Sequence, residues 1–290
     1  ASDVYKRQEL MSGHTSFKIG GPADILVLPE SIEQLREVLK VVKETVVPLT
    51  LLGNGSNVLV RDKGIRGIVI KLGNMLRHFY EAEDLLVFGS GYSLALASYK
   101  AMECGRTGME FAVGIPGSIG GAVYMNAGAY DGEMQNIVNC VKVMDLQGNE
   151  RVLTAEELNF GYRKTSLQNS GLIVTEVTLK MPSGNKDEIK SKMDDFSHRR
   201  ISKQPLEMPS AGSMFKRPPG YFAGTLIDQA GLKGYTVGGA QISTKHAGFV
   251  VNVGGATAAD VLQLIKDVQT KIKAGVGVEL QPEVLVIGEE

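Results

Sequence analysis

Residues 51–60 read LLGNGSNVLV, a glycine-rich segment that lies between two short β-like runs. A dinucleotide-binding fingerprint requires a strand, a G-x-G-x-x-G loop and then a helix, and a Walker loop requires G-K-[ST]. Residues 51–60 contain neither pattern. Because a strand follows the loop where a helix would be needed, the segment argues against a Rossmann domain.

A second segment with few side chains, GIPGSIGGAVYMNAGAY, occupies residues 114–130 and carries no charge. Glycines and small polar residues let backbone N–H groups converge on an anion, and Ser118 with the turn after it could begin a helix. One such segment is most simply a tight turn. Two of them, both with serine and asparagine, make a diphosphate-bearing cofactor as good an explanation as a pair of tight turns.

The surrounding sequence predicts four helices. Amphipathic spacing indicates helices over residues 31–44, 93–105 and 257–275, and a charge-dense stretch indicates one over 184–204. We expect a capping box from Ser31 and Gln34, and a stop at Gly275. The charge-dense helix is expected to join two lobes with a solvated face. The alternative is a basic patch for an anion at His198, Arg199 and Arg200.

Eight β-like runs lie between these helices. They are residues 23–29, 48–53, 67–72, 85–91, 141–153, 171–181, 248–254 and 282–288. Gly148 and Asn149 both tolerate positive φ and predict a hairpin turn. Strands outnumber helices and do not alternate with them, which indicates an α+β fold.

Composition excludes several classes of protein. Among 290 residues, 31 Lys and Arg nearly balance 32 Asp and Glu, so a nucleic-acid partner is not expected. The two cysteines, Cys104 and Cys140, have no metal-ligand spacing, and we expect buried thiols and no metal site. No apolar run reaches membrane-span length and no signal peptide is apparent, so we expect a cytoplasmic protein with no membrane partner. Residues 1–9 carry no usable pattern, and we expect an unstructured or non-native tail.

Six motifs together carry a family resemblance. They are HTSFKIGGPAD (14–24), LLGNGSNVLV (51–60), GIPGSIGGAVYMNAGAY (114–130), FGYRKTS (160–166), SAGSMFKRP (210–218) and LQPEVLVIG (280–288). In this order they resemble the UDP-N-acetylenolpyruvoylglucosamine reductase family, from about Leu10 to the C-terminus. Only 50 residues separate Arg163 from Ser213, so the chain is similar to the shorter class, which lacks an additional tyrosine-bearing loop.

The resemblance implies a domain organisation. Residues 10–203 would form an FAD-binding region of the p-cresol methylhydroxylase/vanillyl-alcohol oxidase (PCMH/VAO) type, with lobes of about 10–73 and 74–203. Residues 204–290 would form a smaller α+β substrate-binding domain. The implied activity is NADPH-dependent reduction of UDP-N-acetylglucosamine enolpyruvate to UDP-N-acetylmuramate through FAD, in peptidoglycan synthesis. The oligomeric state is expected to be a monomer or a weak oligomer.

Three residues match the family's catalytic positions. Arg163 would grip the substrate carboxylate as negative charge grows beside it. Ser213 would donate the proton to the reacting carbon. Glu283, if kept protonated by burial, would hydrogen-bond the developing aci-carboxylate. Outside the motif context these residues would be interpreted as a surface ion pair, a turn serine and an exposed acid at a strand start.

The same motifs assign binding residues. Tyr130, Lys203, Arg217 and His246 would contact the substrate, with cations near its diphosphate. Non-covalent FAD would be bound by the residues at the following positions: Leu52, Gly53, Asn54, Gly55, Ser56, Asn57, Val58, Gly114, Pro116, Gly117, Ser118, Gly120, Gly121, Ala122, Asn126, Ala127, Gly128 and Ile173.

Two alternatives stay open at this point. One is another FAD-dependent oxidoreductase of the same flavin-binding superfamily. Such enzymes often tether FAD through His or Cys, and neither glycine segment contains either residue. The other is a non-enzymatic nucleotide-binding protein, which would be expected to have lost Arg163, Ser213 or Glu283.

Overall fold

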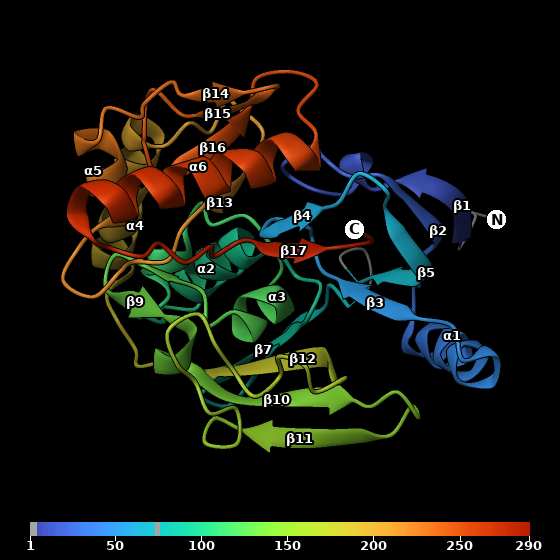
Figure 1. Ribbon diagram of the computed structural model, residues 1–290. Helices are drawn as coiled ribbons and strands as arrows, with labels where there is room; N and C mark the ends of the chain where they lie inside the picture. Colours follow the sequence, from blue (N-terminus) through green and yellow to red (C-terminus); the bar gives the residue numbers. More distant parts are fainter. Residues whose placement is uncertain (1–4, 73–75) are drawn as a thin grey trace. The chain divides into compact units, whose positions relative to one another are not determined.

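The structure is a computed structural model that describes residues 5–72 and 76–290 (Figure 1). The chain divides into two compact units. The first unit comprises residues 1–6, 26–54 and 68–200, and the second comprises residues 7–25, 55–67 and 201–290. The lobe boundary expected at 73/74 lies outside the described residues.

An antiparallel sheet of five strands, in the order β11-β10-β12-β7-β6, forms the base of the first unit. The strands are β6 (Phe79–Ala82), β7 (Leu85–Gly89), β10 (Val138–Met144), β11 (Glu150–Thr154) and β12 (Ile173–Lys180). Helices α2 (Leu94–Glu103) and α3 (Ile119–Tyr124) lie on the same side of this sheet (Figure 1). Their apolar residues share one core with the sheet, including Phe88, Ala97 and Val123. This packing places α3 against β7 and β12.

The first unit also contains helix α1, strand β3, most of helix α4, and the two-stranded sheet of β8 and β9. Helix α1 is Ile32–Thr45, strand β3 is Leu49–Leu52, β8 is Gly128–Ala129, β9 is Gly132–Glu133, and α4 is Lys186–Lys203. Strand β3 pairs in parallel with β5 (Ile65–Lys71), with Leu49 opposite Ile68. Strands β1 (Tyr5–Leu10), β2 (Pro22–Val27), β5 and β3 form a four-stranded sheet in the order β1-β2-β5-β3.

A four-stranded sheet and a long helix form the second unit. The sheet has the order β13-β16-β15-β14, and its strands are β13 (Ser210–Ser213), β14 (Thr236–Val237), β15 (Ala240–Ile242) and β16 (Phe249–Asn252). Helices α5 (Ala223–Gln229) and α6 (Ala258–Val276) share its core through residues such as Ile227, Val261 and Leu264. Strand β17 (Leu285–Ile287) pairs in parallel with β4 (Val58–Val60), with Leu285 opposite Val58.

The structure confirms the α+β arrangement and the four long helices. The eight β-like runs all contain strands, and the glycine-rich residues 53–57 connect β3 to β4, so the strand–loop–strand interpretation is confirmed. The hairpin is confirmed as well, since Met144 lies opposite Glu150. Within its turn Gly148 has a φ of +84°, while Asn149 is not among the residues with positive φ.

Four details of the prediction were wrong. Ser31 Oγ accepts the Gln34 N–H, but Gln34 Oε1 accepts from the backbone of Glu30, so the capping box is only half formed. Helix α6 runs through Gly275 and ends at Val276. Gly277 caps it in the left-handed conformation, with a φ of +72°. Residues 5–9 are not unstructured, because they belong to β1. Arg200 does not lie on a solvated face, because its side chain is buried.

The division into units also differs from the order expected along the chain. The boundary at 200/201 lies close to the predicted 203/204, but residues 7–25 and 55–67 group with the C-terminal segment. Pairing of β17 with β4 is one cause, since it joins residues 285–287 to 58–60. Such long-range parallel pairing has no local sequence signal.

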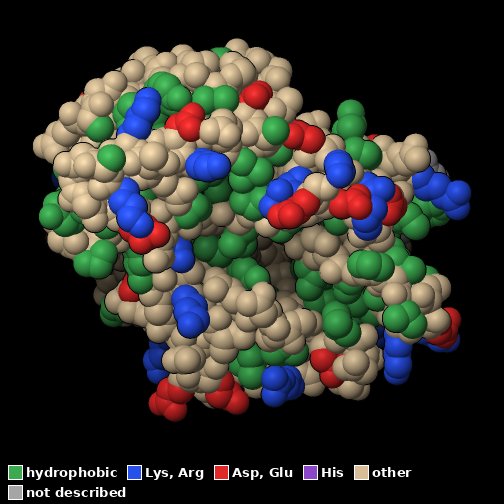
Figure 2. All heavy atoms as spheres, viewed as in Figure 1, with side chains coloured by type: hydrophobic (Ala, Val, Ile, Leu, Met, Phe, Trp, Pro, Cys, Tyr) green, Lys and Arg blue, Asp and Glu red, His purple; other side chains and the backbone are tan. Residues whose placement is uncertain are grey.

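The surface carries both signs of charge. On the face drawn in Figure 2, Lys and Arg side chains are interspersed with Asp and Glu. This mixture agrees with the net charge of −1. Among the described residues, every helix is too short or too polar to cross a membrane.

Candidate cofactor and substrate sites

The first glycine loop contains two different kinds of glycine. Gly55 has a φ of +69°, and a Cβ there would lie 2.3 Å from the His14 carbonyl oxygen, so packing within the second unit requires glycine. A Cβ on Gly53, in the first unit, would meet only Ser118 Oγ, at 3.2 Å. The tight-turn explanation therefore accounts for Gly55, whereas at Gly53 a Cβ would be crowded only by the Ser118 hydroxyl.

The second glycine segment forms helix α3, with Ser118 as its N-cap, as the sequence predicted. Its first amides already have acceptors within the protein. Ile119 donates to Tyr92 O and Gly120 to Ser90 O, both at 2.9 Å, while Gly121 donates to Ser118 Oγ at 3.3 Å. Ala122 donates to Ser118 O at 2.9 Å. These four N–H groups therefore do not form the converging anion nest that the glycines suggested.

Gly120 and Gly121 have different surroundings in α3. A Cβ on Gly120 would lie 2.7 Å from Ser90 Cβ, so glycine is needed for α3 to pack on the sheet. Gly121 is exposed, and a Cβ there would meet only Ser118 Oγ, at 3.4 Å. The absence of a side chain at Gly121 thus leaves exposed backbone in the first turn of α3, which fits a flat ligand lying against main chain.

Asn126, predicted to bind the cofactor, is fully buried and uses its side chain to tie loops together. Its Nδ2 donates to Gly161 O at 3.0 Å and to Glu133 Oε2 at 3.2 Å. Its Oδ1 accepts the Gln135 N–H at 3.0 Å. Both ends of the amide therefore have protein partners, and the Asn126 N–H also donates to Val123 O at 3.0 Å.

Arg163 is bound to the same segment. Its Nη1 donates to Asn126 O at 3.2 Å and its Nη2 to Gly128 O at 2.9 Å. The residue has a φ of +55°, a left-handed conformation that is costly for a side chain of this size. Gln168 Nε2 donates to the Arg163 carbonyl oxygen at 3.1 Å. The structure therefore brings Arg163 together with the predicted cofactor segment.

Tyr130 closes this segment with a second strained backbone, at a φ of +51°. Its ring stacks on Phe196 of α4 with centroids 4.4 Å apart, and its hydroxyl donates to Phe196 O at 3.3 Å. Arg200, one turn further along α4, places its Cδ 2.9 Å from where a Cβ on Gly114 would lie. Burial lowers the pKa of Arg200, and the nearby Tyr130 opposes that shift. The sequence analysis did not single out Phe196, and it named Arg200 only as part of a basic patch, because periodicity in a charge-dense helix does not show which residues are buried.

In the second unit the structure brings together three predicted site positions. The Glu283 N–H donates to Met214 O at 2.9 Å, which places Glu283 beside the end of β13, where Ser213 is exposed. Asn57 Nδ2 donates to Glu283 O at 3.2 Å. Glu283 itself is half-buried. Ser213, Glu283 and the 55–57 end of the glycine loop therefore belong to one local framework.

His246 lies in the same unit. Its Nδ1 accepts the Gly248 N–H at 3.0 Å, and its ring meets Phe249 edge-on with centroids 5.1 Å apart. Burial lowers the pKa of His246, and the positive charges of Lys233 and Lys203 lower it further, while Asp228 opposes them. Lys203 and Arg217 are exposed, and the Arg217 guanidinium lies 4.0 Å from the Phe222 ring centroid. A neutral imidazole near two lysines can donate a hydrogen bond from Nε2 to an anion.

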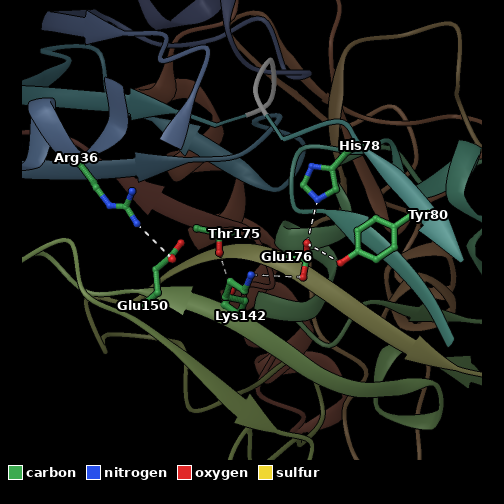
Figure 3. Close-up of polar contacts among 7 residues, drawn as sticks. All are labelled: Arg36, His78, Tyr80, Lys142, Glu150, Thr175 and Glu176. Carbon is green, nitrogen blue, oxygen red and sulfur yellow. Dashed lines mark hydrogen bonds and ion pairs between the residues drawn. The ribbon is translucent and has the colours of Figure 1, made fainter. Parts of the chain in front are cut away.

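A separate polar cluster lies on the first unit's sheet, drawn in Figure 3. Glu176 Oε2 is 3.1 Å from His78 Nε2 and accepts from the Tyr80 hydroxyl at 3.3 Å. Lys142 Nζ lies 3.9 Å from Glu176 Oε1. Burial and Glu176 together raise the pKa of Tyr80. None of the predicted site residues takes part, and we interpret the cluster as cross-strand stabilisation of the sheet.

Comparison with known proteins decides between the open alternatives. A relative from Clostridioides difficile, UDP-N-acetylenolpyruvoylglucosamine reductase, is 50% identical over 285 residues, which cover 98% of this chain and 94% of the relative. The chain belongs to the UDP-N-acetylenolpyruvoylglucosamine reductase family. The family's C-terminal domain model matches residues 204–287, and an FAD binding domain model matches residues 23–154.

Further members of the reductase family agree. The reductase of Geobacillus thermodenitrificans is 50% identical over 284 residues, covering 98% of this chain and 93% of that protein. The crystal structure of UDP-N-acetylenolpyruvylglucosamine reductase from Thermus caldophilus has a TM-score of 0.82 with 40% identity, covering 96% of this chain and 97% of that one. The PCMH/VAO-type FAD-binding fold and the resemblance inferred from six motifs are therefore confirmed.

Proposed function

We propose that this chain reduces UDP-N-acetylglucosamine enolpyruvate to UDP-N-acetylmuramate with NADPH, using bound FAD, in peptidoglycan synthesis. The observation that carries the proposal is the family match over nearly the whole chain. In the net reaction, the enolpyruvyl C=C bond gains a hydride from NADPH and a proton, and NADP⁺ is released.

The residues present fit a non-covalent FAD. When bound, FAD supplies the chemistry that carries hydride from NADPH to the enolpyruvyl CH2 carbon. Gly121 leaves exposed backbone in the first turn of α3, next to the N-cap Ser118. We propose Leu52–Val58 and residues 114–128 as the segments that bind FAD, with contacts from backbone and from small side chains. Asn126 and Ile173 are 0% and 1% exposed, so these two of the proposed positions have little surface to offer the cofactor.

Arg163 holds the substrate carboxylate in this proposal. A guanidinium pairs with two carboxylate oxygens at once, and that pairing strengthens as negative charge moves onto the carboxylate. The bonds to Asn126 O and Gly128 O fix the guanidinium before substrate arrives. Orientation in advance lowers the cost of reaching the transition state.

Ser213 donates the proton to the carbon next to the carboxylate, and Glu283 stabilises the charge that precedes this transfer. A hydroxyl is a weak acid, and it serves here because an enolate is a strong base. The backbone bond from Glu283 to Met214 O keeps the two side chains on neighbouring backbones of the second unit. A carboxyl group that keeps its proton would donate a hydrogen bond to the developing aci-carboxylate.

Lys203, Arg217, Tyr130 and His246 bind the rest of the substrate. Its diphosphate is the largest concentration of negative charge, and exposed cations suit it. Because the reaction uses a nucleotide sugar and NADPH, we propose a cytoplasmic location, and a monomer or weak oligomer that sedimentation can test.

The deciding experiment is anaerobic. Purified protein is mixed first with NADPH and then with UDP-N-acetylglucosamine enolpyruvate while the flavin's visible absorption is followed. We expect bleaching by NADPH and recovery on addition of substrate, with UDP-N-acetylmuramate as the product. Bleaching without recovery would indicate another flavin-dependent oxidoreductase, and a colourless protein that binds no FAD would exclude both.

A further inference from the structure

Ser90 follows β7 in the first unit, at the point where the sheet meets α3. Its N–H donates to Thr175 O at 3.0 Å, and its carbonyl oxygen accepts the Gly120 N–H at 2.9 Å. Its Cβ lies 2.7 Å from the position of a Cβ on Gly120. The side chain therefore lies directly beneath the helix that opens from the second glycine segment.

The Ser90 hydroxyl is buried and has no hydrogen-bond partner within residues 5–72 and 76–290. The residue is 3% exposed, and among the described residues no atom donates to or accepts from its Oγ. Buried hydroxyls in folded proteins nearly always have a partner, so an exception calls for an explanation, such as a ligand or an ordered water that the bare chain does not contain.

Neighbouring polar groups do not supply the partner, because they are already committed. Thr175, across the strand pair, donates its hydroxyl to Lys142 O at 3.2 Å (Figure 3). Ser118 Oγ accepts the Gly121 N–H at 3.3 Å, and the amides of Ile119 and Gly120 donate to backbone carbonyls. Glu176 is next to Thr175 in β12 and so points to the opposite face of the sheet.

We propose that the Ser90 hydroxyl forms a hydrogen bond with FAD when the cofactor is bound, and so acts as a cofactor-binding residue. The inference rests on the proposed function and adds a donor that no motif marked. It accounts for two observations together: the orphaned Oγ, and its position under a segment whose first backbone amides are already used. In this proposal the Ser90 hydroxyl lacks a hydrogen-bond partner only when FAD is not bound.

The test compares full-length wild type with the Ser90→Ala and Ser90→Cys variants, each stripped of flavin and titrated with FAD by fluorescence. Removing one hydrogen bond to a polar ligand should raise the Kd about 5- to 20-fold in Ser90→Ala. Ser90→Cys should show a smaller rise, because a thiol is a weaker donor. Thermal midpoints without FAD should stay equal or rise about 1–3 °C in Ser90→Ala, since an unsatisfied hydroxyl is removed.

Ser98→Ala is the matched control. Ser98 is also a buried serine of the first unit, but its Oγ donates to Ala95 O at 2.8 Å. Its loss should leave the Kd for FAD within twofold of wild type, and any change in midpoint should be the same with and without FAD.

Two results would overturn the inference alone. One is a Kd within twofold of wild type in Ser90→Ala. The other is an equal drop in thermal midpoint with and without FAD, which would indicate a buried water as the partner. If wild type itself binds no FAD, both the inference and the proposed function fail.

Discussion

Arg163 Nη2 donates a hydrogen bond to the carbonyl oxygen of Gly128 at 2.9 Å, across 35 positions of sequence. Together with the bond from Nη1 to Asn126 O, it makes the proposed carboxylate-binding residue part of the proposed cofactor segment. The left-handed backbone of Arg163 is the cost of that placement. The arginine is thus positioned by the fold before any ligand binds.

We predict that Arg163→Lys lowers kcat/KM about 10²- to 10³-fold, because one ammonium cannot pair with two carboxylate oxygens and also reach two backbone carbonyls. Steady-state kinetics measures the loss, and the rate at which NADPH bleaches the flavin should change little. Lys164→Ala, at the exposed neighbouring position, is the control and should stay within about twofold of wild type. Wild-type kcat/KM in Arg163→Lys would remove the arginine from the mechanism.

Ser213→Ala should separate the two halves of the reaction. NADPH should still bleach the flavin at the wild-type rate, while recovery on addition of substrate should slow by about 10²-fold or more, since the proton donor is missing. Stopped-flow absorbance measures both phases. Ser213→Thr keeps a hydroxyl and should recover part of the rate. Recovery at full speed in Ser213→Ala would rule out this serine as the donor.

Glu283→Gln should retain more activity than Glu283→Ala, because an amide still donates a hydrogen bond. The backbone of Glu283 is held by Met214 O and by Asn57 Nδ2, so either substitution should leave the strand in place. We expect at least about a tenfold difference in kcat between the two variants. Equal kcat values would contradict the role of a neutral donor.

His246 should make the folding stability depend on pH. Burial lowers its pKa in the folded state below the unfolded value of 6.5, so below about pH 6.5 the unfolded chain binds more protons than the folded one. The contribution of the neutral His246 imidazole to the free energy of unfolding is therefore complete above that pH. It declines as the pH falls toward the pKa that His246 has in the folded state. In urea unfolding, the stability of wild type relative to His246→Gln should fall between about pH 7.5 and 5.5. A pH-independent difference would show that the imidazole is not desolvated.

Asp62 should stabilise the start of α6. Its carboxylate accepts the Ala258 N–H at 2.7 Å and the Ala259 N–H at 2.9 Å, within the second unit. Asp62→Ala leaves these amides to water and should cost about 1–2 kcal/mol in the free energy of unfolding. Asp84→Ala removes an exposed ion pair with Lys180 and should cost less than about 0.5 kcal/mol. Urea titration of the two variants compares them directly.

The sequence predicted what local patterns encode. Helices α1, α2 and α6 follow from apolar spacing, and Ser118 was recognisable as a helix start. Strands of two to four residues, such as β13 and β14, are too short to show an alternation of apolar and polar residues. The end of α6 moved from Gly275 to Gly277 because helix continuation past one glycine costs only about 1 kcal/mol.

The sequence predicted which residues belong to the candidate site, but it did not predict the hydrogen bonds that these residues form. The motifs pointed to Arg163, Ser213 and Glu283, but they could not reveal that Arg163 bonds to Gly128 O or that Asn126 is consumed by loop contacts. Glycine content suggested free amides in the second segment, whereas the fold assigns Ile119–Ala122 to protein acceptors. Such pairings join distant parts of the chain and have no signature in a window of sequence.

The parallel pairing of β4 with β17 sets an order of events during synthesis. Asn57 and its partner Glu283 are 226 positions apart, so at about 5–20 residues per second the ribosome needs roughly 10–45 s to make the second after the first. Throughout that interval the edge of β4 that β17 later covers has no cognate strand. Nascent chains arrested before residue 285 should therefore be captured more readily by strand-binding chaperones than chains released after residue 288.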